Sequence, residues 1–312
     1  VLAEKMVRHG HRVVIASKTV DTDPSLPGTI YSVKHDIEQK YPDAEIHPFR
    51  LDVRDEGEIQ RLATRLDRQF GGVDVLINNA GALHWKAMTE TPYKKYDLIN
   101  GVNVRGSFLL SACCIRDMIK NNKGGHIIMH SPPLPQPDDT SIYKGKTGYM
   151  ISKYGMTMTA MGISEEYREH GIAGNTIWPA TAIETAAVIN NKLGTPEMWR
   201  KPEIIADAVW EIINEDPTTF TGNQLIDEDY LVTKGVTDFS QYQVIAGSEP
   251  PKLLDIFNKM YKIEGKMGRR YRRSDGIYLY WEIIEDIFSD NIKFPKSEYP
   301  YQYKIDKRLD EK

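Results

Sequence analysis

Short apolar runs alternate with longer amphipathic segments over most of this chain, and that alternation limits the folds available to it. The runs predicted as strands are 12–16, 45–53, 73–78, 126–131, 174–178 and 220–227. The segments with helical periodicity between them include 56–70, 93–120, 148–170 and 202–214. Strands that are apolar throughout are typical of a parallel sheet that helices cover on both faces. The order therefore predicts a doubly wound, Rossmann-like α/β domain over residues 1–237.

The character of the sequence changes after residue 237. Residues 238–312 are predicted to form a C-terminal extension, with an amphipathic helix near 278–288. The residues that would share one apolar face of that helix are Tyr280, Ile283, Ile284, Ile287 and Phe288. Because such a stripe needs a packing partner, we expect the extension to contact this domain, a second copy or a larger assembly.

The charge balance argues against several classes of partner. The formal net charge is −4 and the pI is near 6.1, whereas nucleic-acid binding favours a basic surface. The cluster GRRYRR at 268–273 combines arginines with an aromatic ring, but we interpret it as a solvated turn or a docking site for an acidic partner. No uninterrupted apolar run approaches the roughly 20 residues of a membrane span. Cys113 and Cys114 are adjacent, which fits neither a disulfide framework nor a metal site.

The stretch TGYMISKYG carries the clearest chemical pattern. Tyr149 and Lys153 are four residues apart, so on a helix they share a face. An ammonium beside a phenol favours the phenolate and is expected to lower the pKa of the tyrosine. Such a tyrosine can exchange a proton with a substrate oxygen. The spacing alone is a weak signal, because it recurs at Tyr230 with Lys234 and at Tyr303 with Lys307.

Other polar and small residues follow the predicted strands. Asn79, Ala80 and Gly81 come after the run DVLIN, and Ser131 ends the run HIIMHS. In doubly wound sheets, ligands bind beyond the carboxyl ends of the strands. Asn103 lies within a helical pattern, where an asparagine is usually a surface residue or marks a kink.

These stretches together resemble the short-chain dehydrogenase/reductase family, and within it a subgroup of hydroxysteroid dehydrogenase-like proteins. The subgroup resemblance covers residues 1–257 and depends on several stretches of the sequence. They read VVIASKT, PGTIYS, LDVRDE, HSPPLP, YMISKYGM and WPATAIETAA. The resemblance implies a Rossmann-like fold, a nicotinamide dinucleotide cofactor and interconversion of a hydroxyl and a carbonyl.

The resemblance also implies roles for individual residues. Tyr149 would be the catalytic acid/base, Lys153 would hold the nicotinamide ribose, and Asn103 would anchor a water in a proton relay. Asn79, Ala80 and Gly81 would line the path of the adenosine and its ribose. The residues that would flank the adenine are Asp52 and Val53, and those that would lie near the nicotinamide amide are Pro179 to Thr181.

The end of the first predicted strand bears on the choice of cofactor. NAD-preferring sites place an acid near this position, whereas a basic residue suits the 2′-phosphate of NADP. Here the strand is followed by Lys18, and no acid occurs before Asp21. The sequence therefore predicts NADP, unless Lys18 is simply a solvated loop residue.

Two features depart from the family pattern. The first concerns the serine that usually orients the substrate carbonyl, because its place along the strand is occupied by Pro132. Proline has no side-chain donor. Ser131 or Ser141 could substitute, or the carbonyl could depend on Tyr149 alone.

The second departure is at the N-terminus. The family begins with a strand and a Thr-Gly-x-x-x-Gly-x-Gly loop that holds the pyrophosphate. In this sequence VLAEKMVRHG aligns with the helix that follows that loop. We expect the sequence to be a fragment of a longer protein rather than a fold that has lost its cofactor.

These observations favour an NADP-dependent oxidoreductase acting on a small or lipid-like substrate. The alternative is a catalytically weak or silent relative that serves as an accessory subunit of a larger assembly. By analogy with the family we expect a homo-oligomer formed through the helices at 93–120 and 148–170. The subgroup resemblance implies a mitochondrial or peroxisomal location.

Overall fold

A computed structural model describes residues 1–24, 26–135, 141–253, 271–272 and 278–279. Contacts divide the chain into two units, Val1–Tyr261 and Lys262–Lys312. In the second unit the described residues form a short antiparallel pair, β9 (Tyr271–Arg272) with β10 (Tyr278–Leu279). The predicted amphipathic helix therefore does not include residues 278–279, and 280–288 lie outside the described residues.

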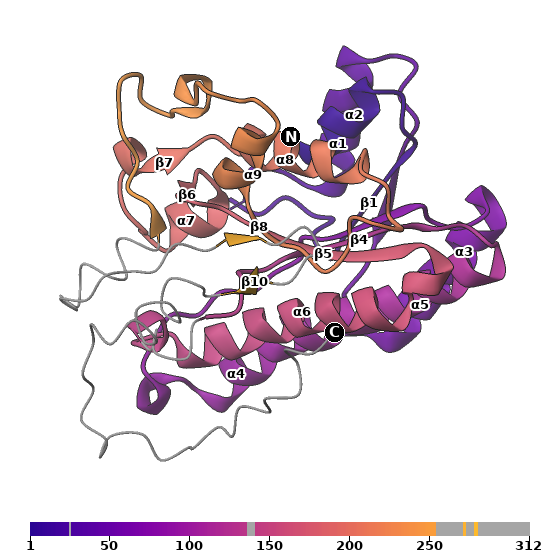
Figure 1. The fold of residues 1–312 in the computed structure, drawn as a ribbon, viewed down its shortest axis with the longest axis horizontal. Helices are drawn as coiled ribbons and strands as arrows, with labels where there is room; N and C mark the ends of the chain where they lie inside the picture. Colours follow the sequence, from indigo (N-terminus) through magenta and orange to yellow (C-terminus); the bar gives the residue numbers. More distant parts are fainter. Residues whose placement is uncertain (25, 136–140, 254–270, 273–277, 280–312) are drawn as a thin grey trace, which may run out of the picture. The chain divides into compact units, whose positions relative to one another are not determined.

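The first unit confirms the predicted alternation of strands and helices (Figure 1). Its first half contains α1 (Leu2–Arg8), β1 (Val13–Ser17), α2 (Ile30–Lys40), β2 (Ile46–Arg50), α3 (Glu56–Phe70), β3 (Val75–Asn78) and η1 (Met88–Glu90). A long helical stretch follows, made of α4 (Tyr93–Asn100), η2 (Gly101–Gly106) and α5 (Ser107–Lys120). Then come β4 (Gly125–His130), η3 (Ser141–Tyr143), α6 (Thr147–Glu166), η4 (Arg168–His170), β5 (Ile172–Trp178), β6 (Ala182–Ile183), α7 (Ala186–Asn190), η5 (Pro196–Met198) and β7 (Trp199–Arg200). The unit continues with α8 (Glu203–Ile213), β8 (Gln224–Ile226), α9 (Asp227–Thr233) and η6 (Ser240–Tyr242).

The main strands are parallel but fall into two hydrogen-bonded sets. One set has the order β3-β4-β5-β8, and the other is the pair β1-β2. The side chains of β1 nevertheless pack against the same cores as the larger set. Val13 and Ile77 of β3 pack against one cluster, and Val14 and Val73, which precedes β3, pack against another. Helices therefore join the two sets into one layer although no ladder of hydrogen bonds does.

Helices cover both faces of this layer, as the sequence predicted (Figure 1). Neighbouring residues of β4 point to opposite faces: Ile127 packs with α5 and α6, whereas Ile128 packs with α8. Both isoleucines are fully buried. A strand that is apolar on both faces can be stable only between two helical layers, which is the arrangement observed.

The helical stretch Tyr93–Lys120 is continuous but not uniform. Its central turn, η2, is a π-helix, with α-helices on either side. By length and composition alone this stretch is apolar enough to cross a membrane, although polar and charged residues such as Arg105 interrupt its apolar run. In the structure its α5 part packs against α3, α6, β3 and β4 of the same domain.

Helix α6 crosses β5 in close contact at Gly174. A Cβ atom on Gly174 would lie 2.2 Å from the carbonyl oxygen of Ala160, whereas one on Gly162 would meet only Glu166, 3.8 Å away. We expect Gly174→Ala to lower the free energy of unfolding by about 2–3 kcal/mol. The matched control Gly162→Ala should raise it by about 0.5–1 kcal/mol, because alanine is the better helix former. Urea unfolding monitored by circular dichroism measures both; equal effects would contradict the assigned contact.

Candidate active site

The carboxyl ends of β3, β4 and β5 and the first turns of α6 bring most of the predicted site residues together. Lys153 is the link between them. Its ammonium donates a hydrogen bond to the carbonyl oxygen of His130, 2.8 Å away at the end of β4. It lies 6.0 Å from the ring centroid of Tyr149 and 5.7 Å from that of Trp178, at the end of β5. Burial lowers the pKa of Lys153 to about 8.

Tyr149 is buried beside Lys153, and the predicted direction of its pKa shift is wrong. Burial raises this pKa above its ordinary value of 10.0. The predicted shift required a full charge close to the phenol. Lys153 instead points its ammonium at a backbone carbonyl, 6.0 Å from the centroid of the Tyr149 ring, and burial is the cause of the shift. At neutral pH Tyr149 is therefore a protonated phenol, whose ring packs edge-on to Trp85 with centroids 6.0 Å apart.

Asn103 is fully buried in the π-helical turn, so the interpretation as a surface residue is wrong, and the turn is a local irregularity of the helix. Its side chain accepts a hydrogen bond from the Ala82 N–H (2.8 Å) and donates to the Ala82 carbonyl (3.0 Å) and to Ser152 Oγ (2.8 Å). These bonds tie the loop after β3 to α6. In that loop, a Cβ atom on Gly81 would lie 3.6 Å from Lys153 Nζ and 3.7 Å from Asn103 Oδ1.

The neighbouring Asn79 has a partner that the sequence did not indicate. His130 Nδ1 lies 2.9 Å from Asn79 Oδ1. Burial, together with the smaller effect of the charge of Lys153, lowers the pKa of His130 to about 3, so the ring is neutral. An amide oxygen only accepts hydrogen bonds, which places the proton of His130 on Nδ1. Asn79 and Ala80 themselves are exposed at the strand end.

Ser131 is fully buried and faces α6 at a different turn from Tyr149. Thr157 Oγ1 donates its one proton to the Pro132 carbonyl at 2.6 Å, so the Ser131 hydroxyl, 2.9 Å from Thr157 Oγ1, is the donor between the two hydroxyls. Thr157 lies two turns beyond Tyr149 along the helix. The described contacts therefore give Ser131 a role in joining β4 to α6. Ser141, the other serine considered, begins the short helix η3.

The residues predicted to bind the adenosine lie at the ends of β1 and β2. Lys18 is exposed directly after β1, and its charge contributes to lowering the pKa of Asp52, which follows β2. The larger cause is Arg54, which donates to both carboxylate oxygens at 2.9 and 2.6 Å and brings this pKa to about 2. Val53 packs against the π-helical turn, where Gly106 leaves room for it.

The loop after β5 contains the remaining predicted residues. Pro179, Ala180 and Thr181 are all buried. The N–H of Ala180 donates to Asp227 Oδ1 at 2.8 Å. The sequence did not single out Asp227, because a lone acid at the end of a strand reads as an ordinary turn residue.

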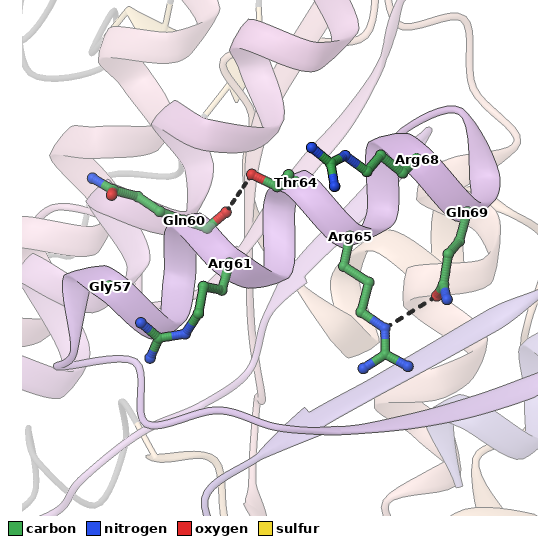
Figure 2. A pocket seen from close by; sticks show the side chains of 7 residues that line it. All are labelled: Gly57, Gln60, Arg61, Thr64, Arg65, Arg68 and Gln69. Atoms are coloured by element: carbon green, nitrogen blue, oxygen red, sulfur yellow. Dashed lines mark hydrogen bonds between the residues drawn. The ribbon is translucent and has the colours of Figure 1, made fainter.

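A hollow of about 530 Å³ lies on α3 and contains none of the predicted site residues (Figure 2). The residues that line it are Gly57, Gln60, Arg61, Thr64, Arg65, Arg68 and Gln69.

Among the described residues no three His, Cys, Asp or Glu side chains gather in a way that could hold a metal ion.

A profile of short chain dehydrogenases matches residues 1–193. The chain belongs to the short-chain dehydrogenase family. Its curated relatives include hydroxysteroid dehydrogenase-like protein 2 of Danio rerio, 43% identical over 259 residues, covering 82% of this chain and 60% of the relative. The Homo sapiens protein of the same name is 36% identical over 309 residues, covering 93% and 72%. These relatives place the chain in that subgroup of the family.

Solved structures agree with this assignment. A short chain dehydrogenase of Mycobacterium thermoresistibile is 38% identical, with a TM-score of 0.73, and the match covers 80% of this chain and 88% of that one. A putative dehydrogenase from Xanthomonas campestris is 32% identical, with a TM-score of 0.74, over 81% and 91% of the two chains. The chain spans about 60% of the length of the first curated relatives.

The stability of the loop after β3 depends on the hydrogen bonds of Asn103 to Ala82. In Asn103→Ala the N–H and carbonyl of Ala82 lose their buried partner, which should lower the free energy of unfolding by about 3 kcal/mol. Hydrogen exchange at the Ala82 amide should accelerate in parallel. The control is Asn100→Ala on the same helical stretch, where the side chain only donates back to the Tyr96 carbonyl. If both variants lose the same stability, Asn103 does not organise the loop.

The burial of Lys153 makes the free energy of unfolding depend on pH. Its folded pKa of about 8 is below its ordinary value of 10.5, so between these values the unfolded chain binds more protons. The free energy of unfolding should therefore rise as the pH increases from about 8 toward 10. In Lys153→Met this rise should be smaller but not absent, because burial also lowers the pKa of Lys146 to about 8. Urea titrations at several pH values give both slopes; identical slopes would show that Lys153 is not held in a dry environment.

Proposed function

We propose that this chain is an NADP-dependent oxidoreductase that interconverts a hydroxyl and a carbonyl, with Tyr149 as the acid/base. The observation that carries the proposal is the joint placement of Tyr149, Lys153 and Asn103 around the Asn79–Gly81 loop. When bound, the dinucleotide would supply or accept the hydride. The side chains of this chain position the reactants and move the proton.

Tyr149 would donate its phenolic proton to the carbonyl oxygen during reduction and recover it during oxidation. The raised pKa of the phenol keeps this proton available at neutral pH. Lys153 would stabilise the phenolate that forms, because its ammonium is already fixed near the ring. Ser131 is engaged by Thr157, so in this proposal the substrate oxygen depends on Tyr149 alone.

The residues present fit the two ends of a dinucleotide. The exposed cation of Lys18 suits a 2′-phosphate, and the loop at Gly81 reaches Lys153, which would hold the nicotinamide ribose. Asp52 and Val53 would flank the adenine, and Pro179 and Thr181 would lie near the nicotinamide. An NADP-bound metagenomic oxidoreductase shares the fold at 23% identity, which supports the fold alone.

The subgroup resemblance supports a small or lipid-like substrate and a mitochondrial or peroxisomal location as further parts of this proposal. The alternative of a silent accessory subunit is not favoured, because Tyr149, Lys153 and Asn103 lie together beside the Asn79–Gly81 loop.

Nucleotide binding tests the choice of cofactor. Fluorescence titration should show tighter binding of NADPH than of NADH. Lys18→Glu should weaken NADPH binding by roughly tenfold or more, since it replaces an attraction to phosphate by a repulsion, and should change NADH binding little. Lys94→Glu, an exposed charge reversal on α4, serves as the control. A Lys18→Glu variant that keeps the preference for NADPH would contradict this part of the proposal.

A homo-oligomer through α5 and α6 is also part of the proposal. Large apolar side chains are exposed on both helices. Phe108 of α5 is 56% exposed, and Met158 of α6 is 61% exposed. Ile151 is also exposed and lies two turns before Met158 on α6. Such residues on adjacent helices are typical of an interface between copies. The double variant Phe108→Glu/Met158→Glu should dissociate the oligomer to monomers in sedimentation velocity. Charged substitutions at Tyr31 and Val232, exposed elsewhere, should not; a wild-type monomer at micromolar concentration would refute the interface.

A further inference from the structure

Asp227 is a fully buried acid that the proposed chemistry does not use. It directly follows β8 and begins α9. Its Oδ1 atom accepts hydrogen bonds from the N–H of Ala180, at 2.8 Å, and from the N–H of Glu228, at 2.6 Å. Within the described part of the chain its Oδ2 atom has no hydrogen-bond partner. A buried carboxyl with one oxygen committed to a distant loop needs an explanation.

Ala180 is held from two sides by segments far along the chain. Its N–H donates to Asp227, and its carbonyl accepts from the N–H of Leu253 at 2.7 Å. The next residue, Thr181, forms an antiparallel bridge with Lys252. The loop begins immediately after Trp178, whose ring lies 5.7 Å from Lys153 Nζ. A shift of the loop would therefore move atoms next to the proposed site.

The charged and titratable groups that act on Asp227 are Glu228, Arg200 and Tyr242. On α9, Glu228 is the nearest acid; it faces Arg200 of β7 at 3.5 Å and Lys252 at 4.0 Å. Tyr242 of η6 donates to Asp207 of α8. Burial and the charge of Glu228 raise the pKa of Asp227, the bonds from Ala180 and Glu228 N–H and the charge of Arg200 oppose this shift, and the resulting pKa is about 7. Burial is the dominant cause.

We propose that Asp227 is a positioning residue that holds the Pro179–Thr181 loop closed and loosens it as the carboxyl ionises. In the closed loop the side chain is shielded from water, so the neutral acid is favoured. In an opened loop the side chain is hydrated and ionises at its ordinary pH. Rising pH between about 4 and 7 therefore favours opening, by at most tenfold per pH unit. The consequence for catalysis rests on the proposed function, whereas the clamp itself does not.

Hydrogen exchange at the Ala180 amide, corrected for the intrinsic rate at each pH, measures loop opening in the chain as it exists. Asp227→Ala removes the acceptor and should reduce protection of Ala180 by about tenfold or more, with Ile127 and Ile177 in the central strands unchanged. Asp227→Asn keeps an amide oxygen as acceptor and cannot ionise. It should retain the protection of Ala180 and abolish its decline between pH 4 and 7.

Two results would overturn the proposal. One is an Asp227→Ala variant whose Ala180 amide is as protected as in the wild type. The other, which decides the matter even if Asp227→Ala does not fold, is an Asp227→Asn variant with the same pH dependence as the wild type.

NADPH titration then tests the link to function. With the fold intact, Asp227→Ala should bind NADPH severalfold more weakly than the wild type at pH 6, whereas Asp227→Asn should keep the wild-type affinity. If the exchange results hold but the wild type binds no NADPH, the clamp stands and the proposed cofactor is wrong. If NADPH binds and neither variant changes its affinity, the loop is clamped but does not position the cofactor, and the positioning role is refuted.

Discussion

The hydrogen bonds of Asn103 are the interaction on which the arrangement of the site depends. They join three elements that have no ladder in common: the loop after β3, the π-helical turn and α6. A π turn leaves backbone carbonyls without their usual partners, and Ser107 compensates by donating to the carbonyls of Asn103 and Val104. The local irregularity of the helix is thus matched by side-chain bonds. Its result is a buried amide aimed at the Gly81 loop.

Helix α6 supplies the second fixed reference. Successive turns on one side of it hold Tyr149, Lys153 and Thr157, and the last two bind the backbone of β4 and the residues after it. The spacing that puts Lys153 next to Tyr149 therefore also fixes how far the strand end can move. The same geometry commits Ser131 to Thr157, so a side chain that resembles a catalytic serine in the sequence has a structural role in the fold.

The electrostatics of the site follow from its dryness. Tyr149, Lys153, His130 and Asp227 all have pKa values shifted toward their neutral forms, and burial is the first cause in each case. A dry site disfavours charge, and any charge that remains or develops in it, such as that of Lys153, interacts strongly with its neighbours. The sequence argument for a lowered tyrosine pKa counted only the neighbouring charge. It could not count the desolvation, which depends on residues distant in the sequence.

By itself the sequence determined the parallel α/β architecture, because strand and helix periods are local properties of the chain. It also determined that Tyr149 and Lys153 share a helical face, since that follows from spacing alone, and it marked Asn103 as a possible kink. Only the tertiary structure decided that Ser131 binds Thr157, that His130 orients Asn79 and that Asp227 holds Ala180. Each of these contacts joins residues at least 26 positions apart. No local pattern encodes such a contact, because it exists only once the strands and helices have packed.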